Sequence, residues 1–169
     1  MALEIHNMAG HLIRRLNQIS TSVFQDRMKA RGLDLTQVQF AAMNAIRANP
    51  GIDQAGLAGM IAYDKATIGG VVDRLESKGL VARRTNARDR RAREVTLTSQ
   101  GAQLLAEVTP DVRELQADIL VGLTEEEQAQ FLKLAEKAAQ GGNMLSRAPL
   151  IMRERREGDE ASAVEAAKG

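Results

Sequence analysis

The 169-residue sequence contains no cysteine and only two histidines, His6 and His11. Without a thiol, the chain can form no disulfide, no zinc–thiolate site, no iron–sulfur cluster and no cysteine-based redox sensor. Two histidines would need carboxylate partners to bind a metal ion, and the sequence shows no such cluster. No serine lies in a nucleophile-elbow context. We therefore predict a protein that is not an enzyme and that uses no metal and no cofactor.

Long hydrophobic runs are also missing, although 44% of the residues are hydrophobic and 27% are charged. No stretch approaches the roughly 20 apolar residues that a membrane-spanning helix needs. The first ten residues lack the basic region and apolar core of a secretory signal. We therefore expect a cytoplasmic protein that makes no membrane contact. Its length suits one domain with a hydrophobic core.

The net charge of +1 conceals an uneven distribution of charge along the chain. The segment from Asp64 to Thr98 holds nine basic and five acidic residues, a net charge of +4, which leaves −3 for the remainder. Six of the basic residues are arginines between positions 83 and 93. A basic focus on an otherwise acidic molecule indicates a polyanionic partner.

Apolar residues at helical spacing predict a mostly α-helical chain. The first helix is expected over about residues 3–30. Each later helix begins at a side chain that can cap its N-terminus. The expected caps are Thr36, Asp53, Asp64, Thr98 and Thr124.

A single β-hairpin interrupts the helices. The runs LVARRT and REVTLT are rich in strand-forming residues and flank the polar segment NARDRRA. Two helices joined by the short connection AYD and followed by a hairpin form a winged helix-turn-helix. We expect one domain over residues 1–147, with the winged helix-turn-helix at about 36–98. The charged tail at 152–169 is poor in large apolar residues and is expected to be disordered.

The expected second helix of this motif, DKATIGGVVDRL, contains two adjacent glycines. Each costs about 1 kcal/mol relative to alanine inside a helix. A helical wheel assigns the core to one stripe: Ile68, Val71, Val72 and Leu75. Ala66 and Gly70 fall nearly opposite this stripe, so a smooth strip would let the helix axis approach a DNA major groove. Close packing against a neighbouring helix is the alternative, and it suits Gly69 about as well.

Several side chains near this strip can contact DNA. Lys65 can meet a phosphate, where the helix dipole also favours negative charge. Thr67 can contact a thymine methyl group or a base-edge acceptor, and Arg74 lies on the same shoulder of the helix. The hairpin tip suits a narrow minor groove because it carries Arg88, Arg90 and Arg91. Asp89 would brace an arginine, because phosphates repel a carboxylate. A solvated loop is the alternative for the tip.

The segment LAGMIAYDKATIGGVVDRLESKGLVARRTNARDRRAREVTLTSQG, residues 57–101, resembles the MarR family of bacterial transcription regulators. The matching elements are Leu57-Ala58, VVDRLESKGLV, DRR at 89–91 and LTSQG at 97–101, and the helix order matches over about 3–145. The resemblance implies a homodimer whose intertwined helices are those at about 3–30, 99–121 and 124–147.

The resemblance also implies a palindromic operator, with recognition helices in successive major grooves and wing arginines in minor grooves. Asp89 would then orient Arg91. Family members usually carry polar side chains at positions 69 and 70. The two glycines here leave more of the DNA contact to Lys65, Ala66, Thr67 and Arg74.

The resemblance further implies release of DNA by a small ligand, often a phenolic or aromatic carboxylate. The absence of cysteine argues against the thiol-oxidation branch of the family, and the scarcity of histidine argues against the zinc-sensing branch. His11 and Arg15 lie four residues apart along one edge of an apolar stripe, which would suit an aromatic acid. Phe40 and Met43 could line the same space. The alternatives are a solvent-edge pair at a dimer interface and, for the two apolar residues, core positions.

The predicted function is therefore a sequence-specific double-stranded DNA-binding transcriptional regulator, a repressor released by an aromatic acid. The alternative is a DNA-binding protein without small-molecule control, which would act architecturally or under a protein partner.

Overall fold

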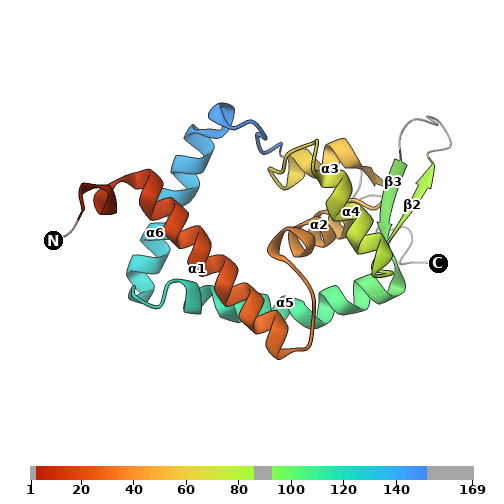
Figure 1. Cartoon of the computed structure of the whole chain (residues 1–169), viewed down its shortest axis with the longest axis horizontal. Coiled ribbons are helices and arrows are strands. Elements are labelled where there is room, and N and C mark those ends of the chain that lie inside the picture. Colours follow the sequence, from red (N-terminus) through yellow and green to blue (C-terminus); the bar gives the residue numbers. More distant parts are fainter. Residues whose placement is uncertain (1–2, 86–92, 152–169) are drawn as a thin grey trace, which may run out of the picture.

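The structure is a computed structural model that describes residues 3–85 and 93–151 (Figure 1). The predicted disordered tail and the predicted hairpin tip lie outside the described residues. The long helices are α1 (Ala9–Ala30), α2 (Gln37–Ala48), α5 (Ser99–Ile119) and α6 (Glu125–Gly141). The shorter helices are η1 (Glu4–Asn7), α3 (Gln54–Met60), α4 (Ile68–Ser77) and η2 (Asn143–Leu145). The strands are β1 (Ile52–Asp53), β2 (Val81–Thr85) and β3 (Arg93–Leu97).

Four of the predicted caps begin their helices as expected. Thr36 and Thr124 each form a complete capping box, in which the cap hydroxyl and the side chain three residues later satisfy backbone amides reciprocally. The Asp53 carboxylate accepts a hydrogen bond from the Gly56 amide at 2.6 Å. The Thr98 hydroxyl accepts one from the Gly101 amide at 3.0 Å. Local side-chain chemistry therefore sets these four helix starts.

The first predicted helix is divided in two. The chain makes the short helix η1, passes through Met8 in an extended conformation (φ −82°, ψ 134°), and starts α1 at Ala9. The η1 turn is closed by short-range bonds, from the His6 amide to Leu3 and from the Met8 amide to Ile5. Because one extended residue shifts the apolar spacing only slightly, hydrophobic periodicity does not reveal the break.

The three strands form an antiparallel sheet in the order β1-β3-β2. The predicted hairpin is confirmed, with register from Val81↔Leu97 to Thr85↔Arg93. Strand β1 was not predicted. It pairs Ile52 with Val95 and has only two residues, too few for an alternating pattern.

One hydrophobic core joins the second half of α1 to α2, α4, the sheet and α5. It contains Phe24 and Met28 of α1, Val95 of β3, and Leu105 and Val108 of α5, all nearly or completely buried. Figure 1 shows the first half of α1 and all of α6 at the end of the molecule away from the hairpin. We call the unit formed by residues 36–98 the winged lobe. Across residues 3–85 and 93–151, no helix has the length and apolar character needed to span a membrane.

Candidate nucleic-acid interface

One face of α4 is committed to the core. Ile68, Val71, Val72 and Leu75 are each at most 4% exposed, as the helical wheel predicts. Their i, i+3, i+4, i+7 spacing forms a narrow stripe that anchors α4 against the rest of the lobe. The other face of the helix is consequently presented outward.

The outward face carries the paired glycines, and neither is held there by tight packing. Gly70 is exposed, and a Cβ built on it would meet no atom within 4 Å. A Cβ on Gly69 would meet only Gln54 Oε1, at an ordinary contact distance of 3.8 Å. Within the described chain, close helix–helix packing therefore does not account for either glycine.

The start of α4 differs from the prediction. The helix begins at Ile68, and residues 65–67 form a turn that precedes it. The Asp64 carboxylate accepts a hydrogen bond from the Ala66 amide at 2.7 Å, and the Asp64 carbonyl accepts from the Thr67 and Ile68 amides. A carboxylate that bonds the amide two residues later forms an Asx turn. Asp64 therefore shapes this turn instead of capping the helix directly.

The turn presents Lys65, Ala66 and Thr67 to solvent, beside the exposed Gly70. The Thr67 hydroxyl donates to the Asp64 carbonyl at 3.1 Å. Its proton is thereby engaged, which leaves the oxygen lone pairs and the methyl group available to a base edge. Within the described chain, no ion pair links Lys65 or Arg74 to an acidic residue.

Two other cations of the basic segment form ion pairs with acidic residues of the same chain. Lys78, at the end of α4, lies 2.8 Å from the Asp34 carboxylate and also donates to the Asp34 carbonyl. These interactions lower the pKa of Asp34, first through the hydrogen bond and then through the charge of Lys78. Lys78 thus ties the end of α4 to the loop between α1 and α2.

Arg83 of β2 makes the second internal cluster. Its guanidinium bonds Glu76, with Nε to Oε2 at 2.9 Å, and lies 2.7 Å from Asp73. The Arg83 backbone amide also donates to Glu76 at 3.2 Å. The Arg83 side-chain hydrogen bond holds the pKa of Glu76 below its ordinary value. The first strand of the hairpin is thereby fixed to α4.

Sequence reasoning missed this cluster, which we call the α4–β2 clamp. The spacing of Asp73 and Glu76 places both carboxylates on one side of α4, but nothing in the sequence shows that Arg83 returns to them. The predicted tip residues Arg88, Asp89, Arg90 and Arg91 lie outside the described residues. The strands place the two ends of that tip at Thr85 and Arg93.

The four predicted effector residues are not gathered in one protomer. The His11 ring lies beside that of His6, with ring centroids 5.4 Å apart and the ring planes tilted by 39°. The polar contact of His11 on α1 is with Arg14, at 3.5 Å, because a residue three positions along a helix is also a neighbour. Phe40 packs near Phe24, 13 residues further along α1 than His11, which corresponds to roughly 20 Å of helix.

Met43 is completely buried in the core, the alternative considered from the sequence. The His11 Nε2 atom is buried and has no hydrogen-bond partner among the described residues. Residues 3–85 and 93–151 contain no group of three or more His, Cys, Asp or Glu side chains placed to hold a metal ion.

Two helices joined by a tight turn, with a clamped hairpin beside the second, define a winged helix-turn-helix DNA-binding protein. A model of the MarR family matches residues 35–92. The transcriptional regulator HosA of Escherichia coli is 36% identical over 135 residues, which cover 80% of this chain and 97% of HosA. The transcriptional repressor NicR of Pseudomonas putida is 34% identical over 79% of this chain and 84% of NicR.

Solved structures with a similar fold are also transcriptional regulators. BpsR of Bordetella bronchiseptica, whose DNA binding is regulated by 6-hydroxynicotinic acid, is 29% identical with a TM-score of 0.74, over 82% of this chain and 98% of BpsR. A mutant of Escherichia coli MarR complexed with operator DNA is 28% identical with a TM-score of 0.67, over 76% of this chain and 91% of that one. The chain belongs to the MarR family of transcriptional regulators. It is accordingly a DNA-binding regulator and not an enzyme.

Proposed function

We propose that this regulator is a repressor that binds a palindromic operator as a homodimer and leaves it when a small aromatic carboxylate binds. The observation that carries the DNA contact is the outward face of α4, where exposed Gly70 leaves room for a groove wall between Lys65 and Arg74. Both cations lack an internal ion-pair partner among the described residues. Phosphates supply the missing counter-charge.

The DNA contacts in this proposal are assigned to residues on the outward face of α4, the turn before it and the wing. Lys65 and Arg74 bind phosphates, while Ala66, Thr67 and the glycine pair Gly69 and Gly70 face the major groove. The wing arginines predicted from the sequence, Arg88, Arg90 and Arg91, enter the minor groove with Asp89 as their brace. Because the α4–β2 clamp joins the hairpin to α4, both elements meet the duplex as one rigid unit.

The proposed dimer rests on apolar surface that one chain leaves uncovered. No residue of α6 is buried, and Leu132 and Leu134 are 59% and 57% exposed. The N-terminal segment adds further exposed side chains: Leu3, Ile5, Met8, Leu12 and Ile13. Apolar surface of this extent is characteristic of an interface, and a two-fold arrangement covers the same patch on both chains.

The proposed effector class rests on relatives and on two basic residues of α1. BpsR responds to 6-hydroxynicotinic acid, and His11 and Arg15 offer groups that can bind such a carboxylate. His11 and Phe40 lie far apart along one protomer, so a pocket that uses both must be completed by the second protomer. We place the protein in the cytoplasm because its proposed partner is DNA.

Two measurements test this function. Gel shifts with DNA from upstream of the gene should show a retarded band at low salt, and its absence would end the proposal. Thermal-shift assays should show a higher Tm with 6-hydroxynicotinic acid than with its uncharged amide, because a ligand of the folded state stabilises it. If aromatic acids neither raise the Tm nor release DNA, the regulator without small-molecule control becomes the better description.

A further inference from the structure

A short segment leads from the end of α6 back to the winged lobe, and we call residues 142–151 the strap. Figure 1 shows it in blue, running from α6 toward α3. The Asn143 side chain holds the Leu150 backbone on both sides, with Nδ2 donating to its carbonyl at 3.0 Å and Oδ1 accepting from its amide at 2.8 Å. These two hydrogen bonds close residues 143–150 into a loop.

The strap also has local features that restrict its conformation. The Ser146 hydroxyl accepts a hydrogen bond from the Ala148 amide at 3.1 Å. A hydroxyl that bonds the amide two residues later forms a turn. Pro149 has a fixed φ and disfavours the helical conformation at the residue before it. The strap is therefore a structured connection with a defined bend and not a loose linker.

The far end of the strap docks on α3. The Ile151 amide donates to the Gly59 carbonyl at 2.8 Å, and the same carbonyl accepts from the Ala62 amide at 3.3 Å, in the turn that ends α3. A Cβ on Gly59 would lie 2.9 Å from Ile151 Cδ1 and 3.3 Å from Ile151 Cβ, so the Ile151 side chain could not stay in place. Gly59 does not have a left-handed backbone conformation that would itself require glycine. Its missing side chain therefore lets the strap dock beside the turn of the helix-turn-helix.

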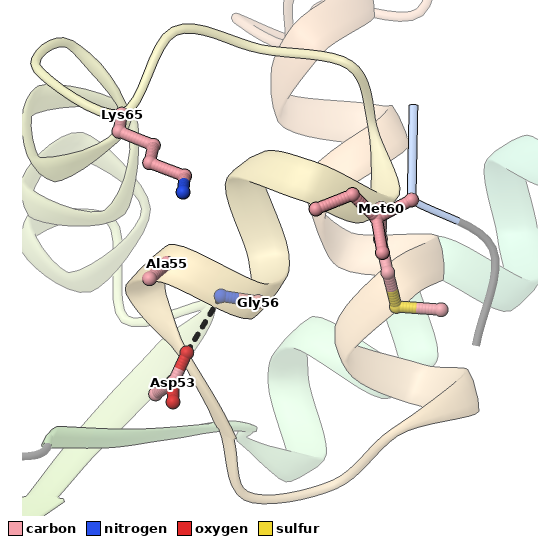
Figure 2. A pocket seen from close by; sticks show the side chains of 6 residues that line it. Asp53, Ala55, Gly56, Met60 and Lys65 are labelled. Atoms are coloured by element: carbon pink, nitrogen blue, oxygen red, sulfur yellow. Dashed lines mark hydrogen bonds between the residues drawn. The ribbon is translucent and has the colours of Figure 1, made fainter. Parts of the chain in front are cut away.

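The docked strap leaves the proposed DNA-binding surface open. Ile151 and Met60 line a hollow of about 290 Å³ together with Lys65. Figure 2 shows the Lys65 side chain extending toward the first turn of α3 across this hollow. Lys65, Thr67 and Gly70 all remain exposed beside it. An effect of the strap on DNA binding must therefore come from the position of the lobe and not from covering α4.

The strap gives α6 a second attachment to the rest of the chain. At its N-terminal end, α6 follows α5 through residues 120–124, and Gln128 Nε2 donates to the Leu120 and Leu123 carbonyls at 3.4 and 3.0 Å. At its C-terminal end, the strap ties α6 to α3. The helix has 17 residues and is about 25 Å long. One attachment alone would let the far end of such a helix swing relative to the lobe, whereas two attachments hold both ends.

This connection determines how each lobe would be placed in the proposed dimer. There, α6 and the first half of α1 form the interface, and the lobe carries the DNA contacts. The orientation of the lobe relative to α6 therefore sets the distance between the two copies of α4. In two-fold helix-turn-helix proteins, that distance must match the spacing of the operator half-sites. One added base pair moves a half-site by about 3.4 Å and rotates it by about 35°.

We infer that the strap sets the half-site spacing that this regulator recognises, by holding each lobe at a fixed orientation to α6. A fixed orientation is preorganised for one spacing, and any other spacing requires the strap to detach. Asn143 and Gly59 are positioning residues, because they act through the placement of the lobe. The inference rests on the proposed function, since it needs a dimer and an operator with two half-sites.

Hydrogen exchange in the full chain tests whether the strap is docked. The Ile151 amide is protected while it bonds Gly59, so Asn143→Ala should release the strap and accelerate exchange in peptides from residues 143–151. Gln140→Ala is the matched control, because this exposed amide lies at the same end of α6 and bonds Glu136 at 3.0 Å. Equal exchange in the wild-type protein and Asn143→Ala would show that Asn143 does not hold the strap.

Operators with altered spacing test what the strap does. The operator identified by gel shift is compared with copies that have one base pair added or removed between the half-sites, by fluorescence anisotropy. The wild-type protein should prefer one spacing. Asn143→Ala and Gly59→Ala should each reduce this preference by roughly three- to tenfold, the range expected for the net loss of one hydrogen bond. Gly141→Ala is the control for the second variant, because a Cβ there meets no atom within 4 Å.

Two further readouts separate the strap from a DNA contact and from the fold. The dependence of log Kd on log salt should be unchanged in both variants, because no phosphate contact is lost. Gly59→Ala should not lower the Tm, because alanine favours a helix over glycine. A shallower salt dependence would mean that the variant had removed a DNA contact, and this would contradict a positioning role.

The absence of cysteine makes the separation of the lobes measurable. Ala48→Cys, at the exposed end of α2, allows one spin label per protomer. Double electron–electron resonance without DNA should give a broader distribution of distances when Asn143→Ala is also present. An equally narrow distribution would show that the strap does not hold the lobes.

A variant that frees the strap by hydrogen exchange and yet keeps the wild-type spacing preference would overturn the inference. A sharper preference in such a variant would overturn it too. The proposed function fails separately, when the wild-type chain binds no operator or its spin labels show no dipolar coupling. Hydrogen exchange reports on the strap in either case.

Discussion

The winged lobe buries its apolar side chains, whereas α6 leaves most of its apolar side chains exposed to solvent. In the lobe, Val72, Leu75 and Val95 are completely buried within one chain. In α6, no residue is buried, and leucines on two positions of the helix remain more than half exposed. The lobe therefore completes its core with α1 and α5 of the same chain, whereas the described residues leave most apolar side chains of α6 uncovered. The comparison separates residues that stabilise the protomer from residues that would stabilise an assembly.

The largest expected effects test this separation directly. Leu75→Ala should lower the free energy of unfolding by roughly 2–5 kcal/mol, because it leaves a cavity in the lobe core. The loss should be the same at every protein concentration. Leu132→Asp in α6 should instead lower the Tm most at low protein concentration, where a weakened dimer dissociates. Thermal unfolding over a hundredfold concentration range distinguishes the two, and a concentration-independent loss in Leu132→Asp would contradict the dimer role of α6.

Two glycines, one in α4 and one in α5, differ in how closely the rest of the chain packs against them. A Cβ on Gly101 would lie 1.9 Å from the Leu80 carbonyl oxygen, whereas one on Gly70 would meet nothing. Gly101→Ala should therefore cost about 3 kcal/mol through forced backbone displacement. Gly70→Ala should stabilise the helix by up to about 1 kcal/mol. Urea titrations give both values, and a destabilised Gly70→Ala protein would mean that Gly70 is packed after all.

The cations of the basic segment also fall into two groups. Some form ion pairs within the described chain, and others have no such partner there. Arg74→Gln should reduce the salt slope of operator binding by about 1 per protomer, because glutamine carries no charge to pair with a phosphate, and it should leave the Tm unchanged. Arg83→Gln should lower the Tm, because Asp73 and Glu76 lose their partner in the α4–β2 clamp. A lower Tm in Arg74→Gln would show that this side chain also has a structural partner.

The smallest effect concerns pH. The folded-state pKa of Glu76 is lowered by Arg83, so its contribution to stability is present above the unfolded-state pKa of about 4.3 and is lost as the pH falls through the folded-state value. The Tm difference between the wild-type protein and Glu76→Gln should therefore be constant near neutral pH and shrink below about pH 4.3. Differential scanning fluorimetry from acidic to neutral pH measures it. A difference that grows toward low pH would contradict the direction of the pKa shift.

Much of the fold could be predicted because the side-chain patterns that determine it lie within a few residues of one another. The capping boxes at Thr36 and Thr124, the strand-forming runs of the hairpin and the core stripe of α4 each depend on side chains a few residues apart. The same is true of the outward position of Gly70, which follows from the stripe opposite it. Predictions that depended on exact backbone conformation did less well, as the break at Met8 and the late start of α4 show.

The amino-acid sequence by itself determined where most helices begin, which face of α4 is buried and which segment concentrates positive charge, since neighbouring residues control these properties. Only the tertiary structure decided which cations remain available. Arg83 is engaged with α4, and Lys78 with Asp34, through interactions between segments that no local pattern connects. It also decided that Ile151 rests on Gly59, since the segment that follows η2 could pack against any of several surfaces. Packing selects one of them.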